Sequence, residues 1–363
     1  MINRIGLRAF VFITLAFSAL FLAVPQARAD NSCADDFANS GIVSTAGSVA
    51  IVASDNLSAG GNLNYFWQKT GTSTWHRELV AEANGGSCPG NCTGWCPQVP
   101  WGYLSNAIAW TGQSVIIAGK DQRDGGLYFW WQEADNTIWH QQTVAAGPPG
   151  CCAYGSIVNG VVTTTNLGYS MPSLAWTSRS AVIAACDEAG NLQYWYQNKG
   201  QTTWFHEQVA SDGCKSQPSI AWTGTSVVIA AACNQSLSSM LCYYWQQAGT
   251  GSWTRQVVDN GLTYAPSIGW TGNAVIIAAE QAGANDALSI AYWWQAAGTG
   301  TWHKQPVYGS TNSDFSPPTI AAASGSVVIA AGEAALQANR LDYWWEPATS
   351  NGSLDAREPC RHW

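Results

Sequence analysis

Charged residues are scarce in this chain, at 10% of its 363 residues, and the formal net charge is −8. Only 15 residues are Lys or Arg, and they are scattered rather than clustered. Nucleic acids and anionic membranes select for basic patches, so neither is an expected partner. Long apolar runs are also rare. Beyond residue 24 no stretch reaches the ~20 apolar residues of a membrane span, and the sequence predicts none.

The one long apolar run lies at the N-terminus. Arg4 and Arg8 precede an apolar stretch that runs from Ala9 to Val24, and Ala27-Arg28-Ala29 follows it. A basic start, a short apolar segment and a small-residue site are typical of a secretory signal peptide. We therefore expect residues 1–29 to be a cleaved signal peptide and the mature chain to be secreted or periplasmic.

A unit of roughly 50 residues recurs along the chain. Its first half is clearest as SIAWTGTSVVIAAAC, from Ser219 to Cys233, and the six copies start near residues 41, 106, 172, 218, 266 and 318. Each unit holds four short runs rich in Val, Ile, Tyr and Trp, separated by Thr-Gly or Gly-Thr turn signals, which indicates an antiparallel meander. The sequence thus predicts an all-β fold, a six-bladed β-propeller of four-stranded antiparallel blades, with residues 30–363 as one domain. A two-domain β-sandwich would not explain six copies.

The third run of each unit carries large side chains on both faces. One face of the first copy holds Leu63, Tyr65 and Trp67. The opposite face holds one ring in each unit: Phe66, Trp130, Trp195, Tyr244, Trp293 and Trp344. Strands buried on both faces are expected where each sheet lies between two others. Most of the 21 tryptophans are therefore expected to pack blade against blade.

Eleven cysteines in an exported chain predict disulfides rather than metal ligands. Cys33 and Cys360 lie at opposite ends of the mature chain, which a closed ring brings together, so we expect them to pair. The other expected pairs are Cys186 with Cys214, Cys233 with Cys242, and two bonds with one thiol left over among Cys88, Cys92, Cys96, Cys151 and Cys152. Their spacing is not a standard zinc or iron–sulfur pattern, and no metal or cofactor is predicted.

Segments that break the repeat are the first candidates for a binding site. The connections 85–103 and 147–169 are lengthened on either side of the second unit, and long loops on a rigid scaffold often bind ligands. At the same end of the fold, the residue after the second strand is acidic in four units. These acids could accept hydrogen bonds from sugar hydroxyls, bind a cation, or only cap a turn. The candidate ligand-binding residues are Asp55, Asp121, Asp187, Glu333, Trp95, Trp101, Tyr103 and Tyr154.

Neighbouring Trp and His residues form another repeated feature: Trp75-His76, Trp139-His140 and Trp302-His303. An aromatic ring beside a neutral donor would suit stacking against a sugar, while core packing explains the same residues without a ligand.

The motif L-x-Y-W-W-Q, followed by Trp seven residues after the Gln, recurs in five units. It resembles the repeats of propeller lectins of the Photorhabdus-lectin and tectonin type, over about twenty residues per unit. That resemblance implies several sugar sites, between blades or in loops. The first half of the unit, WTGxSVVIAA, lies outside the resemblance.

Three functions are compatible with these features. The favoured one is non-catalytic carbohydrate or cell-surface binding, because several equal sites gain strength through avidity. A protein-interaction or structural propeller is the second. The third is a sialidase-like glycoside hydrolase, since AGTGTWH is similar to the sialidase motif S-x-D-x-G-x-T-W, but the aspartate is absent from every unit. Hydrolysis needs a carboxylate pair, or a tyrosine with an acid, in one pocket. No unit carries acidic residues that set it apart from the other units. No catalytic residue is therefore predicted.

Overall fold

The fold is known from a computed structural model. The structure describes residues 37–45, 48–55, 61–68, 71–72, 74–83, 102–121, 124–133, 137–147, 155–158, 161–164, 168–212, 214, 216–235, 238–247, 251–282, 288–309, 314–315, 317–323, 326–335, 338–346 and 355–356. The expected signal peptide, residues 1–29, lies outside them. All regular structure in the described residues is β-strand.

The first three blades are four-stranded antiparallel sheets in which each strand pairs with the next along the chain. Blade 1 contains β1 (Phe37–Ser44), β2 (Val49–Asp55), β3 (Leu63–Gln68) and β4 (Trp75–Ala81). Blade 2 contains β5 (Tyr103–Trp110), β6 (Val115–Asp121), β7 (Leu127–Gln132) and β8 (Trp139–Ala145). Blade 3 contains β11 (Ser173–Trp176), β12 (Ser180–Cys186), β13 (Leu192–Asn198) and β14 (Phe205–Ala210).

The last three blades repeat this arrangement, with a divided first strand in blade 6. Blade 4 contains β15 (Ser219–Trp222), β16 (Ser226–Gln235), β17 (Ser238–Gln247) and β18 (Trp253–Asp259). Blade 5 contains β19 (Thr263–Trp270), β20 (Ala274–Ala282), β21 (Leu288–Ala296) and β22 (His303–Gly309). In blade 6, β23 (Asp314–Phe315) and β24 (Thr319–Ala323) both pair with β25 (Ser326–Ala335), which β26 (Ala338–Glu346) and β27 (Asp355–Ala356) follow.

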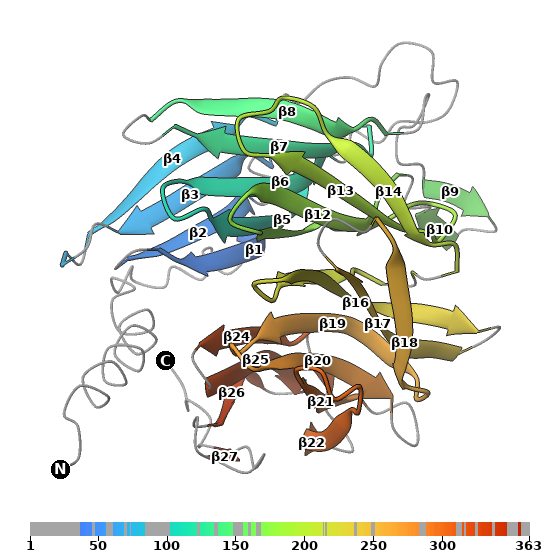
Figure 1. Cartoon of the computed structure of the whole chain (residues 1–363). Helices are drawn as coiled ribbons and strands as arrows, with labels where there is room; N and C mark the ends of the chain where they lie inside the picture. The colour runs from blue at the N-terminus through green and yellow to red at the C-terminus, as the bar shows by residue number, and fades with distance from the viewer. Residues whose placement is uncertain are drawn as a thin grey trace.

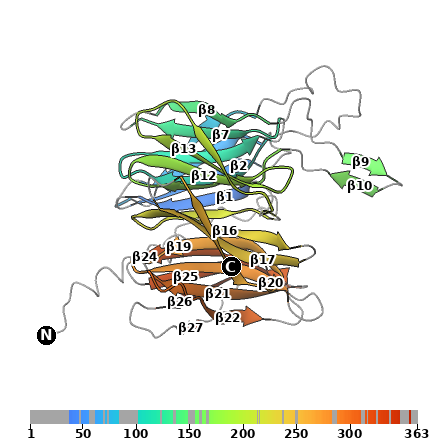
Figure 2. The same ribbon diagram turned by 45° about the vertical axis from the view of Figure 1, so that its right-hand side comes forward.

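The blades follow one another around the fold as the sequence predicts, and the six-bladed propeller is confirmed (Figure 1). A short hairpin of β9 (Gly155–Val158) and β10 (Val161–Thr164) belongs to the connection after blade 2. In Figure 2 it stands apart from the blades. The lengthened connection therefore forms structure of its own rather than extending a blade.

The first strand of each blade lies against the first strand of the next. Side chains link these strands directly: the backbone N–H of Ile220 donates to Ser173 Oγ, and that of Ile268 donates to Ser219 Oγ, each at 3.0 Å. The equivalent bond from Ile320 N to Ser267 Oγ, also 3.0 Å, joins blades 5 and 6. Ser173, Ser219 and Ser267 therefore each accept a hydrogen bond from the first strand of the next blade.

The third strands are buried on both faces, as predicted. In blade 2, Leu127 and Phe129 face one neighbour and Trp130 faces the other, with exposed fractions of 1%, 4% and 0%. Apolar clusters fill each of five successive blade junctions, from blades 1 and 2 to blades 5 and 6. Burial of these rings is the main stabilising contribution to the fold.

Two disulfides lie in the described residues, and both are pairs that the sequence suggested. Cys186, at the end of β12, bonds Cys214 in the connection to blade 4, with their Cα atoms 5.6 Å apart. Cys233 and Cys242 bond across the β16–β17 hairpin, with a Cα separation of 5.8 Å. The expected Cys33–Cys360 pair lies outside the described residues, as do the other cysteines of the two insertions: Cys88, Cys92, Cys96, Cys151 and Cys152.

Candidate functional site

A pair of hydrogen bonds, which we call the clamp, joins consecutive blades near their outer strands. At the junction of blades 3 and 4 (junction 3–4), Glu207 of β14 accepts both bonds on Oε2. Gln246 Nε2 of the next blade donates at 2.8 Å and Trp253 Nε1 donates at 3.0 Å. The clamp recurs with Glu78, Gln132 and Trp139 at junction 1–2, and with Gln256, Gln295 and Trp302 at junction 4–5.

The clamp tryptophan also packs edge-on against the third strand of the preceding blade. Trp253 meets Tyr194 with ring centroids 5.0 Å apart, and Trp302 meets Tyr243 at 5.2 Å. The same contact joins Tyr65 to Trp139 and Phe129 to Trp204. Such edge-to-face pairs add about 0.5–1.5 kcal/mol beyond burial. The Gln and the following Trp of the repeated motif therefore hold blades together, as expected for most tryptophans here.

A second set of rings stacks at the rim beside each clamp. His76 stacks on Trp67 at 4.3 Å, and His303 stacks on Trp294 at 5.1 Å. In blade 3 the pair is Phe205 on Tyr196, at 5.0 Å with an interplanar angle of 18°. We call these pairs, together with His140 on Trp131, the rim stacks. In each stack the third-strand ring is partly buried, and in blades 1, 3 and 5 the fourth-strand ring is exposed, whereas His140 of blade 2 is partly buried.

The rim stacks differ from the Trp–His pairs that the sequence suggested. Adjacent strand residues point to opposite faces. His76 therefore does not share a face with Trp75, but lies on the face of Trp67, the residue directly across from it in β3. Trp75 and His76 are neighbours in sequence only, and the stacked pair is formed across strands.

The clamp acceptors were missed at the sequence level. Each lies opposite the tyrosine or phenylalanine of the third strand, as Glu78 does opposite Tyr65 and Glu207 opposite Tyr194. Gln142 and Gln256 hold the same place in blades 2 and 4. An acceptor side chain at this register in successive fourth strands is a repeat signal that alignment of those strands would have found.

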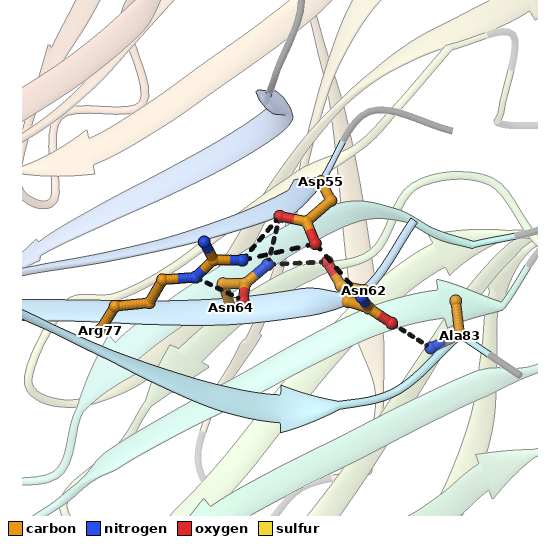
Figure 3. Close-up of polar contacts among 5 residues, drawn as sticks. All are labelled: Asp55, Asn62, Asn64, Arg77 and Ala83. Atoms are coloured by element: carbon orange, nitrogen blue, oxygen red, sulfur yellow. Dashed lines mark hydrogen bonds and ion pairs between the residues drawn. The ribbon is translucent and has the colours of Figure 1, made fainter. Parts of the chain in front are cut away.

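The first predicted acid, Asp55, lies in a network at the end of β2 (Figure 3). Its carboxylate accepts from Asn64 Nδ2 at 2.8 Å and Asn62 Nδ2 at 3.2 Å, and forms an ion pair with Arg77 at 3.1 Å. Asn62 Oδ1 in turn accepts from the backbone N–H of Ala83 at 2.9 Å. Asp55 is only 8% exposed, so these bonds tie together the second, third and fourth strands of its own blade.

Asp187 makes equivalent contacts in blade 3. Its carboxylate accepts from the Asn191 backbone N–H at 2.9 Å, from Asn191 Nδ2 at 2.8 Å and from Gln193 Nε2 at 2.6 Å. Burial by itself raises the pKa of Asp187, but these hydrogen bonds outweigh it and hold the pKa below its ordinary value. The contacts are those of a turn, one of the alternatives that the sequence left open.

Two of the other predicted ligand residues, Tyr103 and Asp121, lie directly across from each other in β5 and β6. Asp121 is 2% exposed and Tyr103 is 3% exposed, with the Tyr103 ring edge-on to Trp130 at 5.1 Å. Tyr103 packs in the core of junction 1–2, which makes it a poor ligand contact. Glu333 pairs through its backbone with Phe315 and Arg340, and its side chain is not described. Trp95, Trp101 and Tyr154 lie outside the described residues. Binding at the predicted loops therefore stays a prediction.

Ion pairs near the opposite face of the fourth strands also connect blades. Lys304 of blade 5 lies 2.7 Å from Asp259 of blade 4, and Arg255 of blade 4 lies 3.0 Å from Asp212. Burial by itself raises the pKa of Asp259, but the bond and charge of Lys304, with the Gly261 N–H, hold the pKa below its ordinary value. Lys304 and Arg255 therefore form ion pairs that stabilise the fold.

Within the described ranges, no group of three or more His, Cys, Asp or Glu side chains is placed to hold a metal ion. The same residues include no helix long and apolar enough to cross a membrane.

No protein-family model matches the sequence, and no curated protein matches it. Solved structures do. A Trypanosoma rangeli sialidase in complex with sialic acid superposes with a TM-score of 0.52 at 10% identity, over 86% of this chain and 54% of that one. The SapL1 lectin in complex with α-methyl fucoside gives 0.53 at 9% identity, over 89% and 97%.

The β-propeller domain of the Trilobed protease from Pyrococcus furiosus, described as having an open velcro topology, gives a TM-score of 0.52 at 9% identity, over 90% of this chain and 84% of that one. This chain spans about half the length of the sialidase and most of the length of the other two. At such identities the similarity shows a shared propeller fold.

Proposed function

We propose that the protein is an exported, non-catalytic carbohydrate-binding propeller whose sugar sites lie at the rim stacks between blades. The observation that carries this proposal is the repeated placement of a partly exposed ring stack beside the acceptor and donor groups of the clamp. An aromatic face suits the apolar C–H face of a sugar, and amide, carboxylate and indole groups suit its hydroxyls.

Repetition supports binding rather than catalysis. Rim stacks occur in blades 1, 2, 3 and 5, each in the same register of the third and fourth strands. Several weak sites on one rigid ring would gain strength against a surface that displays many copies of a glycan. Glycans on a cell surface are the ligands that we propose. Two of the similar structures were solved with sugars bound, which agrees with this ligand class.

Tyrosine chemistry of the sialidase kind receives no support from the described tyrosines of the blade cores. Burial, with a smaller contribution from Glu78, raises the pKa of Tyr65 to about 12, and burial raises the pKa of Tyr244 to about 12. Burial also raises the pKa of Tyr194 and Tyr243. Burial therefore makes the phenolate, the better nucleophile, harder to form at these tyrosines.

The proposal is tested on a glycan array with the purified exported chain, and then with a variant in which the outer rings are removed. His76→Ala, His140→Ala, Phe205→Ala and His303→Ala together should abolish binding to any glycan that the array identifies. A matched control is the double variant Leu79→Ala with Val257→Ala. Both residues are exposed, and both lie in fourth strands on the face opposite the rim stacks. Absence of binding across the array, or full binding by the ring-deleted variant, contradicts the proposal.

Export is tested separately. N-terminal sequencing of the protein recovered outside the cytoplasm should begin at Asp30, and an N-terminus at Met1 contradicts the predicted cleavage.

A further inference from the structure

The described clamps use similar residues but leave different atoms available. At junction 1–2 both oxygens of Glu78 are occupied: Oε1 accepts from Trp67 Nε1 at 3.0 Å, and Oε2 accepts from Gln132 at 3.0 Å and Trp139 at 3.2 Å. At junction 3–4, Glu207 Oε2 receives both clamp bonds. In the part of the chain that the structure describes, no side chain or backbone N–H donates to Glu207 Oε1.

The difference has a single-residue cause. Trp67 supplies the third donor at junction 1–2, and the equivalent residue of blade 3 is Tyr196, which has no indole N–H. Tyr196 lies across from Phe205 as Trp67 lies across from His76. The ring stack is therefore kept at junction 3–4 while the bond that would occupy the carboxylate is lost.

The outer ring also changes at this junction. Phe205 takes the place that histidine holds in blades 1, 2 and 5, and it is 42% exposed. An exposed phenylalanine has no polar group to hydrate, so covering it with an apolar surface is favourable. Phe205 and Glu207 are two residues apart in β14, so their side chains lie on the same face of the strand. The exposed ring and the available oxygen are therefore on the same side.

At the junctions built on glutamine, the one side-chain oxygen already accepts at least one hydrogen bond. Gln256 Oε1 already accepts from Gln295 and Trp302, and its Nε2 donates to the Gly300 carbonyl at 2.7 Å. Gln142 Oε1 accepts from Gln197 at 2.8 Å, and its Nε2 donates to the Thr202 carbonyl.

We propose that junction 3–4 is a binding site for neutral saccharides, in which Glu207 Oε1 accepts hydrogen bonds from sugar hydroxyls and Phe205 packs against the C–H face of the ring. This rests on the proposed function and assigns its ligand class. A free carboxylate oxygen accepts and cannot donate, so it selects hydroxyl donors. It also repels uronic and sialic acids. The basic residues beside this junction in sequence face away from Glu207 or are paired: His206 lies on the other face of β14, and Arg255 forms an ion pair with Asp212.

The experiment titrates the whole exported chain by calorimetry with neutral methyl glycosides (fucoside, galactoside, mannoside and glucoside) and with two acidic sugars, methyl glucuronide and N-acetylneuraminic acid. A neutral glycoside should bind at least about tenfold more tightly than either acid. Tyr196→Trp should place an indole N–H on Glu207 Oε1, as Trp67 does on Glu78, and weaken binding at this site by about tenfold. Tyr196→Phe keeps the ring without the N–H and should bind within about twofold of the wild type.

Three results overturn the assignment: unchanged binding by Tyr196→Trp, equal loss in Tyr196→Phe, or binding of an acidic sugar as tight as that of the best neutral one. Thermal unfolding of both variants shows whether a loss comes from misfolding. Glycan binding that survives Tyr196→Trp leaves the proposed function intact and moves the site elsewhere. Failure of every sugar on the array contradicts the proposed function itself.

Discussion

Junctions 1–2 and 3–4 are built from the same plan and differ in what their glutamates do. Glu78 receives three donors and is part of the scaffold, whereas Glu207 receives two and keeps one oxygen open. The exchange of Trp67 for Tyr196 accounts for the difference. In this fold a site can therefore arise by removing one bond from a structural clamp, without any new element.

The largest expected effect is on stability at junction 1–2. Glu78→Ala leaves the donors of Trp67, Gln132 and Trp139 without an acceptor and should lower the free energy of unfolding by about 3 kcal/mol. Glu207→Ala leaves the donors of Gln246 and Trp253 without an acceptor and should lower the free energy of unfolding by about 2 kcal/mol. Urea unfolding of both variants measures the comparison. A larger loss for Glu207→Ala would contradict the difference in occupancy.

Replacing the clamp tryptophans should separate the hydrogen bond from the packing. Trp253 Nε1 bonds Glu207, while Trp204 Nε1 at junction 2–3 is buried and has no hydrogen-bond partner among the described residues. Trp253→Phe and Trp204→Phe remove similar volume, but only the first loses a bond. We expect Trp253→Phe to be about 1 kcal/mol more destabilising than Trp204→Phe in chemical unfolding. Equal losses would mean that the clamp bond contributes nothing beyond ring packing.

The ion pair at junction 4–5 should give a smaller, pH-dependent effect. The pKa of Asp259 is held below its ordinary value, so its contribution is present above the unfolded pKa of about 4 and is lost as pH falls through the folded pKa. Asp259→Asn should cost about 1 kcal/mol at neutral pH, because the Lys304 side chain is 42% exposed and the pair is partly screened.

Unfolding measured from about pH 7 to pH 3 should show the wild type and Asp259→Asn converging in acid. Asp212→Asn is the matched control at junction 3–4, where the acid side chain is 50% exposed, and should cost less. A gap between wild type and Asp259→Asn that widens as pH falls would reverse the expected sign.

The fold was predictable because its determinants are local and repeated. Six copies of alternating strands with turn signals define the blades, and the doubly buried third strand follows from rings such as Trp130 on one face and Phe129 on the other. The disulfide Cys233–Cys242 was expected because the two cysteines bracket a single turn, and Cys186–Cys214 was expected as the remaining pair. Ring closure through Cys33 and Cys360 stays a prediction.

The site was less predictable because it depends on which partners share one carboxylate. Sequence repetition drew attention to Asp55 and Asp187, and the structure shows each bonded within its own blade. The repeat in the sequence gave no sign that Glu207 and Phe205 would face the same junction as Trp253 of the next blade. Contacts between units are formed by register and packing across a junction, which a pattern within one unit does not contain.

Glutamine substitutions at the two glutamates test the central claim most directly. Glutamine in place of Glu207 can accept both clamp bonds on one oxygen, as Gln256 does, but it replaces Oε1 with a donor. Glu207→Gln should therefore keep its unfolding free energy within about 0.5 kcal/mol and lose neutral-sugar binding by about tenfold. Glu78→Gln should lose about 1–2 kcal/mol of stability, since its amide N–H₂ meets a donor, and bind sugar normally. The reverse outcome, with binding lost in Glu78→Gln and kept in Glu207→Gln, would contradict the account.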